Sequence, residues 1–246
     1  MKHQRGFSII EIAVVLIVVG MLLMSAVPTM TEWMRNAKLR NQAEALQAGM
    51  QQARNEALRR NQPVSFYMVS ADSATSLDSS CVVSASGTSW VVSVRDPAGA
   101  CESAPAVTST DSDNPLIVAT HVGADGASGV AVSGLASDGT TAASSITFDA
   151  LGRASGNLRQ IEVNYATAQT GDRPLRVNVS AAGMVRMCDT TVSASDDPRR
   201  CLTDSGSDAS SGTSGTGGTS GTGGDTPIST NEDTHGSNDV VPSTQQ

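Results

Sequence analysis

Glu11 is the residue whose setting most clearly requires a chemical partner. It is the only ionisable side chain between Phe7 and Val27, and the rest of that stretch is mainly apolar. A carboxylate inside a membrane-spanning helix costs about 2.5–3.5 kcal/mol on insertion scales, so such a placement is a functional-site hypothesis by default. If the chain is cut between Gly6 and Phe7, the new α-amino group of Phe7 supplies a cation close to Glu11. We therefore predict ion pairing between these two groups, on the same chain or on neighbouring chains.

The apolar stretch 7–27 has the length of a membrane span. As a helix it is about 30 Å long, the thickness of a bilayer's hydrocarbon core. The leader contains Lys2, His3 and Arg5, and the next basic residue is Arg35. This distribution predicts a cytoplasmic N-terminus and an exported remainder. A cleaved signal peptide is an alternative, but the small residues that could end one, near Ala26, come too late. An ordinary signal anchor with a tolerated Glu11 is the other alternative.

The order Gly6-Phe7-Ser8-Ile9-Ile10-Glu11, followed by the apolar run and Pro28, resembles the class III leader and N-terminal helix of type IV pilins and type II secretion pseudopilins. The resemblance implies that a prepilin peptidase cleaves after Gly6 and N-methylates Phe7. It also implies that Glu11 recognises the Phe7 amine of the adjacent subunit during assembly. The partners it implies are the peptidase, other major and minor pilins or pseudopilins, and an inner-membrane assembly platform.

The cysteines all follow the apolar segment, and an even number of them in an exported chain indicates disulfides. A zinc site is the competing interpretation, but it prefers short paired spacings such as C-x-x-C, which this sequence lacks. Three pairings are possible. We expect the sequence-local one, in which each bond would add roughly 3 kcal/mol of stability in the chain-entropy model. The expected pairs are Cys81 with Cys101 and Cys188 with Cys201.

Catalytic chemistry has little support in the sequence. The histidines are His3, His121 and His235, too dispersed to assemble a triad or a zinc site without the C-terminal tail. The acidic pairs Asp111/Asp113 and Asp196/Asp197 lack the dense oxygen-ligand spacing of a calcium loop and fit turns better. We expect no enzymatic activity, no cofactor and no metal.

Two patterns predict the elements that carry these residues. After Pro28, small and aliphatic residues recur at steps of four and three, which predicts a helix that is kinked at Pro28 and runs to about Arg60. Beyond Pro63 the period changes to two, which predicts strands separated by loops rich in Ser, Asp, Gly and Thr. The helical stripe is Leu39, Ala43, Leu46, Met50, Ala53 and Ala57, and the strand candidates are 64–69, 90–94, 116–119, 146–148, 161–165, 175–179 and 184–187.

The segments Ile146–Arg153 and Leu175–Cys188 are similar to the GspH/FimT group of minor pilins and pseudopilins, and the similarity extends over residues 1–201. It implies a structural subunit that primes or caps assembly of a type IV pilus or a type II secretion pseudopilus. The expected location is the inner membrane with a single span and a periplasmic C-terminal domain, and then the filament. The sequence does not distinguish between the two kinds of filament.

DNA binding is an alternative function. Arginine forks bind phosphate groups bidentately, and seven arginines lie between Arg153 and Arg200. Some FimT-type proteins are DNA receptors with a Gly-Arg-x-Arg motif in the last hairpin. The corresponding segment here, Gly183 to Arg186, lacks the first arginine of that motif. The candidate DNA-binding residues are Arg186, Arg199 and Arg200.

The C-terminal tail contributes much of the net charge of −8, because it contains six acids and no Lys or Arg. Its Gly, Ser, Thr and Asp content predicts disorder. The expected fold is α+β: a long N-terminal transmembrane helix leads into an antiparallel β-sheet or sandwich domain of pilin type. The expected ranges are a leader at 1–6, a helix at 7–61 with the span at 7–27, a periplasmic β domain at 62–202, and the tail at 203–246.

Overall fold

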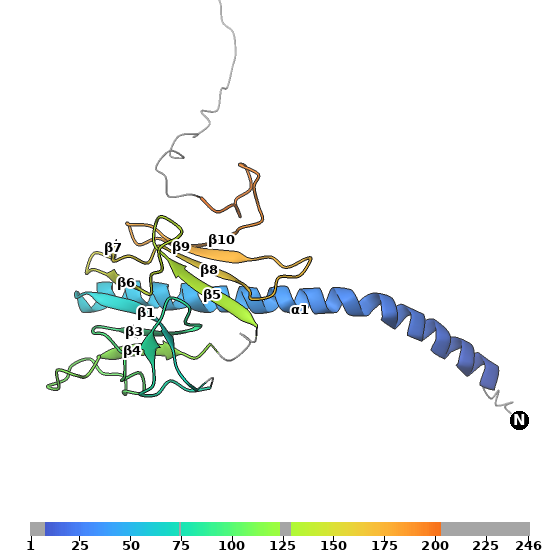
Figure 1. Ribbon diagram of the computed structural model, residues 1–246, viewed down its shortest axis with the longest axis horizontal. Coiled ribbons are helices and arrows are strands. Elements are labelled where there is room, and N and C mark those ends of the chain that lie inside the picture. The colour runs from blue at the N-terminus through green and yellow to red at the C-terminus, as the bar shows by residue number, and fades with distance from the viewer. Residues whose placement is uncertain (1–7, 74, 124–128, 203–246) are drawn as a thin grey trace, which may run out of the picture. The chain divides into compact units, whose positions relative to one another are not determined.

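One long helix and two antiparallel sheets make up the fold (Figure 1). The computed structural model describes residues 8–73, 75–123 and 129–202, and the side chains of 25–29 lie outside the description. Three predictions concern residues outside this description. They are the cleavage of the leader 1–6, the methylation of Phe7 and the disorder of the tail 203–246. Among the described helical residues, no segment combines the length and apolar character needed to cross a membrane.

Helix α1 (Ile9–Arg60) continues through Pro28 and ends where the sequence predicts. Asn61 adopts the left-handed conformation that commonly ends helices, at φ 52°, and its N–H donates to the carbonyl of Ala57. Pro63 follows two residues later and cannot continue the helix. The predicted apolar stripe, Leu39 to Ala57, is fully buried.

The first sheet has the order β4-β3-β1-β6-β7, and β2 pairs with part of β1. Its central strand β1 is built mainly from β-branched and aromatic residues, which favour strands. All its pairings are antiparallel. The strands are β1 (Val64–Ser70), β2 (Val82–Val83), β3 (Ser89–Ser93), β4 (Ile117–His121), β6 (Ser145–Phe148) and β7 (Ala154–Ser155).

The second sheet has the order β10-β9-β8-β5 and is also antiparallel. Along β8 and β9, buried apolar residues alternate with polar ones, so one face of the sheet lies on the core and the other carries the polar side chains. The strands are β5 (Val130–Leu135), β8 (Gln160–Tyr165), β9 (Leu175–Val179) and β10 (Val185–Asp189).

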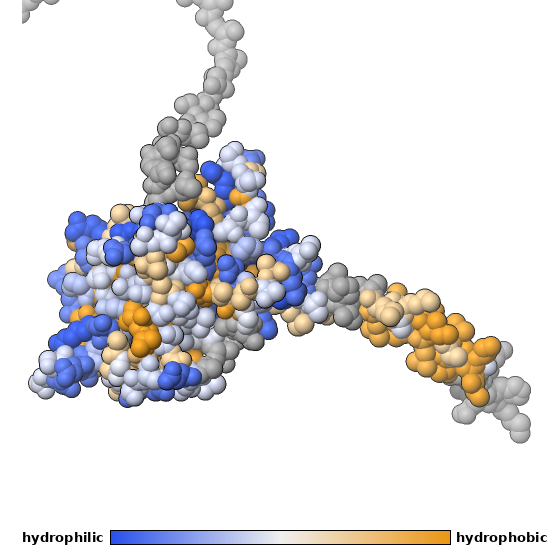
Figure 2. Space-filling model, viewed as in Figure 1, coloured by the Kyte–Doolittle hydropathy of each residue, from blue (hydrophilic) through white to orange (hydrophobic). Residues whose placement is uncertain are grey.

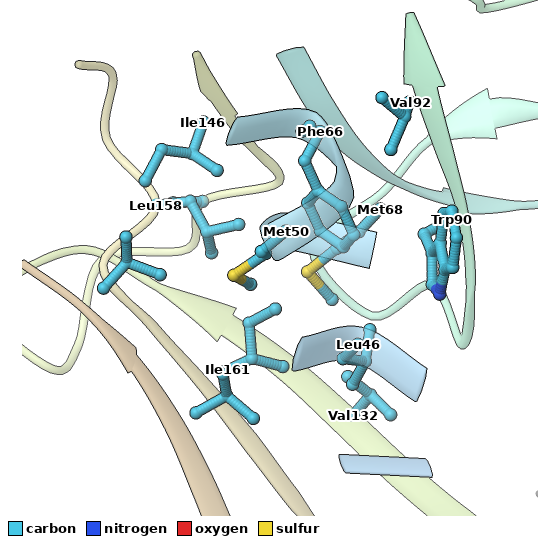
Figure 3. Packing of buried hydrophobic residues seen from close by; sticks show 14 of the residues in the cluster. Leu46, Met50, Phe66, Met68, Trp90, Val92, Val132, Ile146, Leu158 and Ile161 are labelled. Atoms are coloured by element: carbon cyan, nitrogen blue, oxygen red, sulfur yellow. The ribbon is translucent and has the colours of Figure 1, made fainter. Parts of the chain in front are cut away.

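The main core lies between α1 and both sheets (Figure 3). Leu46 and Met50 of α1 meet Phe66 and Met68 of β1, and Ile161 of β8 belongs to the same cluster. A smaller cluster lies on the other face of the first sheet, around the disulfide between Cys81 and Cys101. The helix therefore packs against both sheets.

Three strands, β2, β5 and β7, fall outside the predicted ranges. Two of them are only two residues long, and β5 contains Ala131 and Gly134, which are weak strand formers. The start of β4 also differs from the prediction, because Leu116 has a φ of 54° and cannot belong to a regular strand. The α+β class with an N-terminal helix and antiparallel sheets agrees with the prediction.

Candidate functional site

The first half of α1 exposes an apolar surface that nothing in the described structure covers. Ile9 is 91% exposed and Met24 is 83% exposed. Figure 2 shows hydrophobic residues concentrated along this half of the helix, whereas the visible face of the β domain is mostly hydrophilic. An exposed apolar surface of this size marks a contact with a membrane or with another protein.

Glu11 is the one acidic residue among the exposed apolar residues 9–24, and it lies in the first turn of α1. Its N–H donates to the carbonyl of Ser8 at 3.0 Å, so its backbone belongs to the helix start. A carboxylate in the first turn interacts favourably with the helix dipole. Gly6 and Phe7, between which we expect cleavage, and the Phe7 amine that we expect to pair with Glu11 lie outside the described residues.

A network of polar contacts fastens α1 to the loop between β8 and β9 at the point where the helix enters the β domain. Arg35 donates two hydrogen bonds to the Asp172 carboxylate, at 2.8 and 2.7 Å, and its guanidinium carbon lies 3.7 Å from the centre of the Tyr165 ring. Tyr165 in turn donates to the carbonyl of Arg35. Asn36 bonds the loop backbone at Gly171 and Arg173. We call Arg35, Asn36, Tyr165, Gly171 and Asp172 the helix–loop clamp.

The charges in the helix–loop clamp reinforce one another. Hydrogen bonds from Arg35, and a further one from the N–H of Gln169, hold the pKa of the Asp172 carboxyl below its usual value, although burial acts in the opposite direction. The same bond to Asp172 raises the pKa of Arg35. Gly171 is required here because its φ is +93° and an added Cβ would lie 2.5 Å from a Glu32 side-chain atom.

Both disulfides in the structure are the sequence-local ones. Cys81 is bonded to Cys101 and Cys188 to Cys201. The second bond ties the end of β10 to the last described residues, where Asp189 donates its N–H to the carbonyl of Arg199. It therefore fixes the segment that carries two of the candidate DNA-binding residues.

Two of the candidate DNA-binding arginines, Arg186 and Arg199, line different pockets. Arg199 is paired with Asp197 at 2.8 Å, and this guanidinium lowers the pKa of Asp197 to about 2, so both partners are charged at neutral pH. Arg186 donates to the carbonyl of Pro198, and Arg200 lies beside Asp189. Arg199 lines a pocket between α1 and β10, whereas Arg186 lines a different pocket.

The pocket lined by Arg186 contains two further arginines, Arg159 of the loop before β8 and Arg176 of β9. Arg176 and Arg186 lie on the face of the second sheet that points away from the core, and Arg159 lines the pocket from the chain just before β8. Arg159 and Arg176 are two of the seven arginines between Arg153 and Arg200, but neither is among the predicted site residues. The alternation of β9 is the signal that could have found Arg176, since it puts Arg176 and Asn178 on one face, whereas Arg159 lies before β8 and has no such signal.

The remaining chemical candidates have structural partners. His121 stacks on Trp90 with ring centres 5.5 Å apart. Asp111 accepts a hydrogen bond from the N–H of Asp113 at 2.9 Å, which is a turn contact. Asp196 lies in an exposed turn beside Asp197. His3 and His235 lie outside the described residues, and no group of three or more His, Cys, Asp or Glu in the described part could hold a metal ion.

Comparisons with known proteins give two sequence matches. The family model described as type II transport protein GspH matches residues 42–183, which is more than half of the 246 residues. The model of the prokaryotic N-terminal methylation motif matches residues 1–27. The curated proteins contain no significant match.

Two solved structures are similar to the chain, and both are crystal forms of the Pseudomonas aeruginosa (strain PAO1) type IV minor pilin FimU. In space group P21 the TM-score is 0.36 at 18% identity, covering 61% of this chain and 88% of that chain. In space group P65 the TM-score is 0.33 at 17% identity, covering 60% and 90%.

Proposed function

Because the chain belongs to the GspH family of minor pilins and pseudopilins, we propose that it is a structural subunit that primes or caps a type IV pilus or a type II secretion pseudopilus. The observation that carries the proposal is a single carboxylate, Glu11, among the otherwise apolar and exposed helix residues 9–24, which lie within the match to the N-terminal methylation motif.

In this proposal a prepilin peptidase cleaves after Gly6 and methylates Phe7. Residues 7–27 are held in the inner membrane with the β domain in the periplasm. The basic leader supports this orientation, and the exposed apolar side chains from Ile9 to Met24 support the position in the membrane. The inner-membrane assembly platform then moves the subunit into the filament.

Glu11 has a defined role in that step. An isolated carboxylate in hydrocarbon is unfavourable, and a neighbouring α-amino group removes that penalty by pairing with it. The Phe7 amine of the next subunit is a cation that every copy of a processed pilin presents. Pairing with it would set the axial position of each helix relative to its neighbour.

The helix–loop clamp supports the same function mechanically. Arg35 and Asn36 fix the helix to the β domain just beyond its exposed half. Rigid attachment at this point carries the β domain along when the helix moves out of the membrane. The side chains of Arg35 and Asp172 are only 24% and 8% exposed. Such a shielded ion pair is consistent with an attachment that persists while the subunit moves.

DNA binding through Arg186, Arg199 and Arg200 has less support. Arg199 is neutralised by Asp197, and Arg186 and Arg199 line different pockets. A phosphate backbone would have to break the Arg199 pair to use that side chain. We therefore propose only the subunit function.

The substitution Glu11→Leu tests the proposal. Removing the carboxylate should leave membrane insertion at least as efficient, because Leu is favourable in hydrocarbon. Truncating one partner of a desolvated charge pair costs roughly 2–5 kcal/mol, so the amount recovered in sheared filaments should fall by about tenfold or more. The measurement is immunoblotting of membrane and filament fractions.

Glu44→Gln is the matched control, because Glu44 is an exposed helix acid that pairs with Arg40. It should leave both fractions unchanged. Undiminished filament incorporation of the Glu11→Leu chain would show that Glu11 has no part in assembly.

A further inference from the structure

We propose that the pocket on the outer face of β8, β9 and β10 binds a phosphate group through Arg159, Arg176 and Arg186. The pocket has a volume of about 760 Å³. This function is additional to the filament role and does not depend on it. We call this site the arginine pocket and define it by these three residues with Asn178.

The sheet register brings the arginines together. Ile161 and Val177 point into the core, so the alternate residues of β8 and β9 point outward. Gln160, Asn178 and Arg186 are paired across three adjacent strands, and Arg176 lies two residues from Asn178 on the same face. Arg159 precedes β8 and reaches the pocket from its end.

The charge in the arginine pocket is incompletely balanced. Arg176 pairs with Glu162 at 2.6 Å, but Arg159 and Arg186 have no carboxylate partner among the described residues. Asp138 is the acid that lines the pocket, and its carboxylate accepts hydrogen bonds from Thr140 and Thr141 of its own turn. The arrangement favours an anion.

Three polar atoms of pocket residues are buried without a hydrogen-bond partner in the described structure. They are Arg159 Nη1, Arg176 Nε and Asn178 Oδ1. Buried polar groups are nearly always paired, and a buried charged donor without an acceptor is especially unfavourable. All three atoms are shielded from solvent, so in the proposed complex the side chains turn toward the pocket and the ligand then supplies the missing partners.

The identities of these atoms define the ligand. Two of them are guanidinium donors, which match the oxygens of an oxyanion, and the third is an amide acceptor, which requires a donor. Hydrogen phosphate supplies both kinds of group, whereas sulfate supplies acceptors alone. Asn178 Nδ2 already donates to the carbonyl of Leu202, which fixes the orientation of the amide with its oxygen unpaired. The pocket should therefore prefer phosphate over sulfate.

The test is calorimetric titration of the full chain in detergent with inorganic phosphate, sulfate and glucose 6-phosphate, against sodium chloride of equal ionic strength. We expect saturable phosphate binding with a Kd of about 1 mM or tighter, and weaker binding of sulfate. Arg159→Gln and Arg186→Gln should each weaken phosphate binding by about tenfold. Equal binding of glucose 6-phosphate would extend the ligand class to phosphate esters, and its failure to bind would restrict the class to the free ion.

Arg153→Gln is the control, because Arg153 is another exposed arginine that pairs with Asp149 outside the pocket. It should bind phosphate as the parent does. Arg159 and Arg186 are replaced in preference to Arg176 because their replacement leaves no carboxylate unpaired. NMR provides a second measurement, in which the Nε–H resonances of Arg159 and Arg176 should shift when phosphate binds. An absence of saturable binding, equal losses in the Arg153→Gln chain, or binding of duplex DNA without binding of phosphate would overturn the proposal.

Discussion

Arg35 and Asp172 form an ion pair that is largely shielded from solvent and joins residues 137 positions apart. The pair makes the stability of the helix attachment depend on pH. The pKa of Asp172 is lower in the folded protein than its ordinary value of 3.8. The folded state therefore binds this proton less readily than the unfolded chain, and the resulting stabilisation is present above the unfolded pKa.

We predict that this stabilisation is lost as the pH falls from about 4 through the folded pKa of Asp172. The Asp172→Asn chain should be less stable than the parent at pH 7, and the difference should shrink on acidification. The measurement is urea unfolding of the full chain in detergent at a series of pH values. Asp113→Asn, in an exposed turn, should show no such difference, and a pH-independent deficit for Asp172→Asn would refute the assigned ion pair.

The roles and contacts of single residues can be predicted from the sequence to different extents. The prediction for Glu11 depends on local evidence: a lone acid in an apolar run, at a fixed distance from the expected cleavage junction between Gly6 and Phe7. The bond between Arg35 and Asp172 is not predictable, because no short-range pattern connects a helix residue to a loop residue so far along the chain. The positions of Arg186 and Arg199 depend likewise on which face of β10 and of the following loop each side chain takes.

At the scale of elements, the contact between α1 and the first sheet depends on Gly49. A Cβ added at this position would lie 2.7 Å from Trp90 and 2.9 Å from Phe66. Both rings are buried in the main core, so neither can move away freely. The close approach of the helix to β1 and β3 therefore requires a residue without a side chain.

We predict that Gly49→Ala destabilises the β domain by about 1–3 kcal/mol, the usual cost of overpacking, even though Ala is the better helix former. Thermal unfolding followed by the tryptophan signal measures the change. Gly20→Ala is the matched helical control, since no atom lies within 4 Å of its added Cβ. A Gly49→Ala chain as stable as the parent would mean that the helix lies farther from the sheet.

The elements were predicted where periodicity was strong. The stripe from Leu39 to Ala57 repeats often enough to identify a helix face, and the alternation in β8 and β9 identifies strands. Strand β5 was missed because Ala131 and Gly134 give a weak alternating signal, and it is stabilised by its pairing with β8. The sequence predicts a sheet or a sandwich but not which strands belong to each of the two sheets, since that depends on pairings between distant segments.

At the scale of the whole molecule, the two disulfides close loops with sequence separations of 20 and 13 residues. Each should contribute about 3 kcal/mol by restricting the unfolded chain. We predict that non-reducing peptide mapping of the exported protein finds Cys81 linked to Cys101 and Cys188 linked to Cys201. Replacing Cys188 and Cys201 together by Ala should lower the free energy of unfolding by about 2–4 kcal/mol. A Cys101–Cys188 peptide or four free thiols would contradict the pairing.

The central claim is that this chain is processed and assembled as a member of the GspH family, and the N-terminus of the mature protein tests it most directly. Mass spectrometry of the protein recovered from the envelope should identify Phe7 as the first residue, carrying one methyl group on its α-amine. Glu11 then lies close to that amine, as ion pairing between subunits requires. An intact Met1, or a new N-terminus near Ala26, would contradict the account.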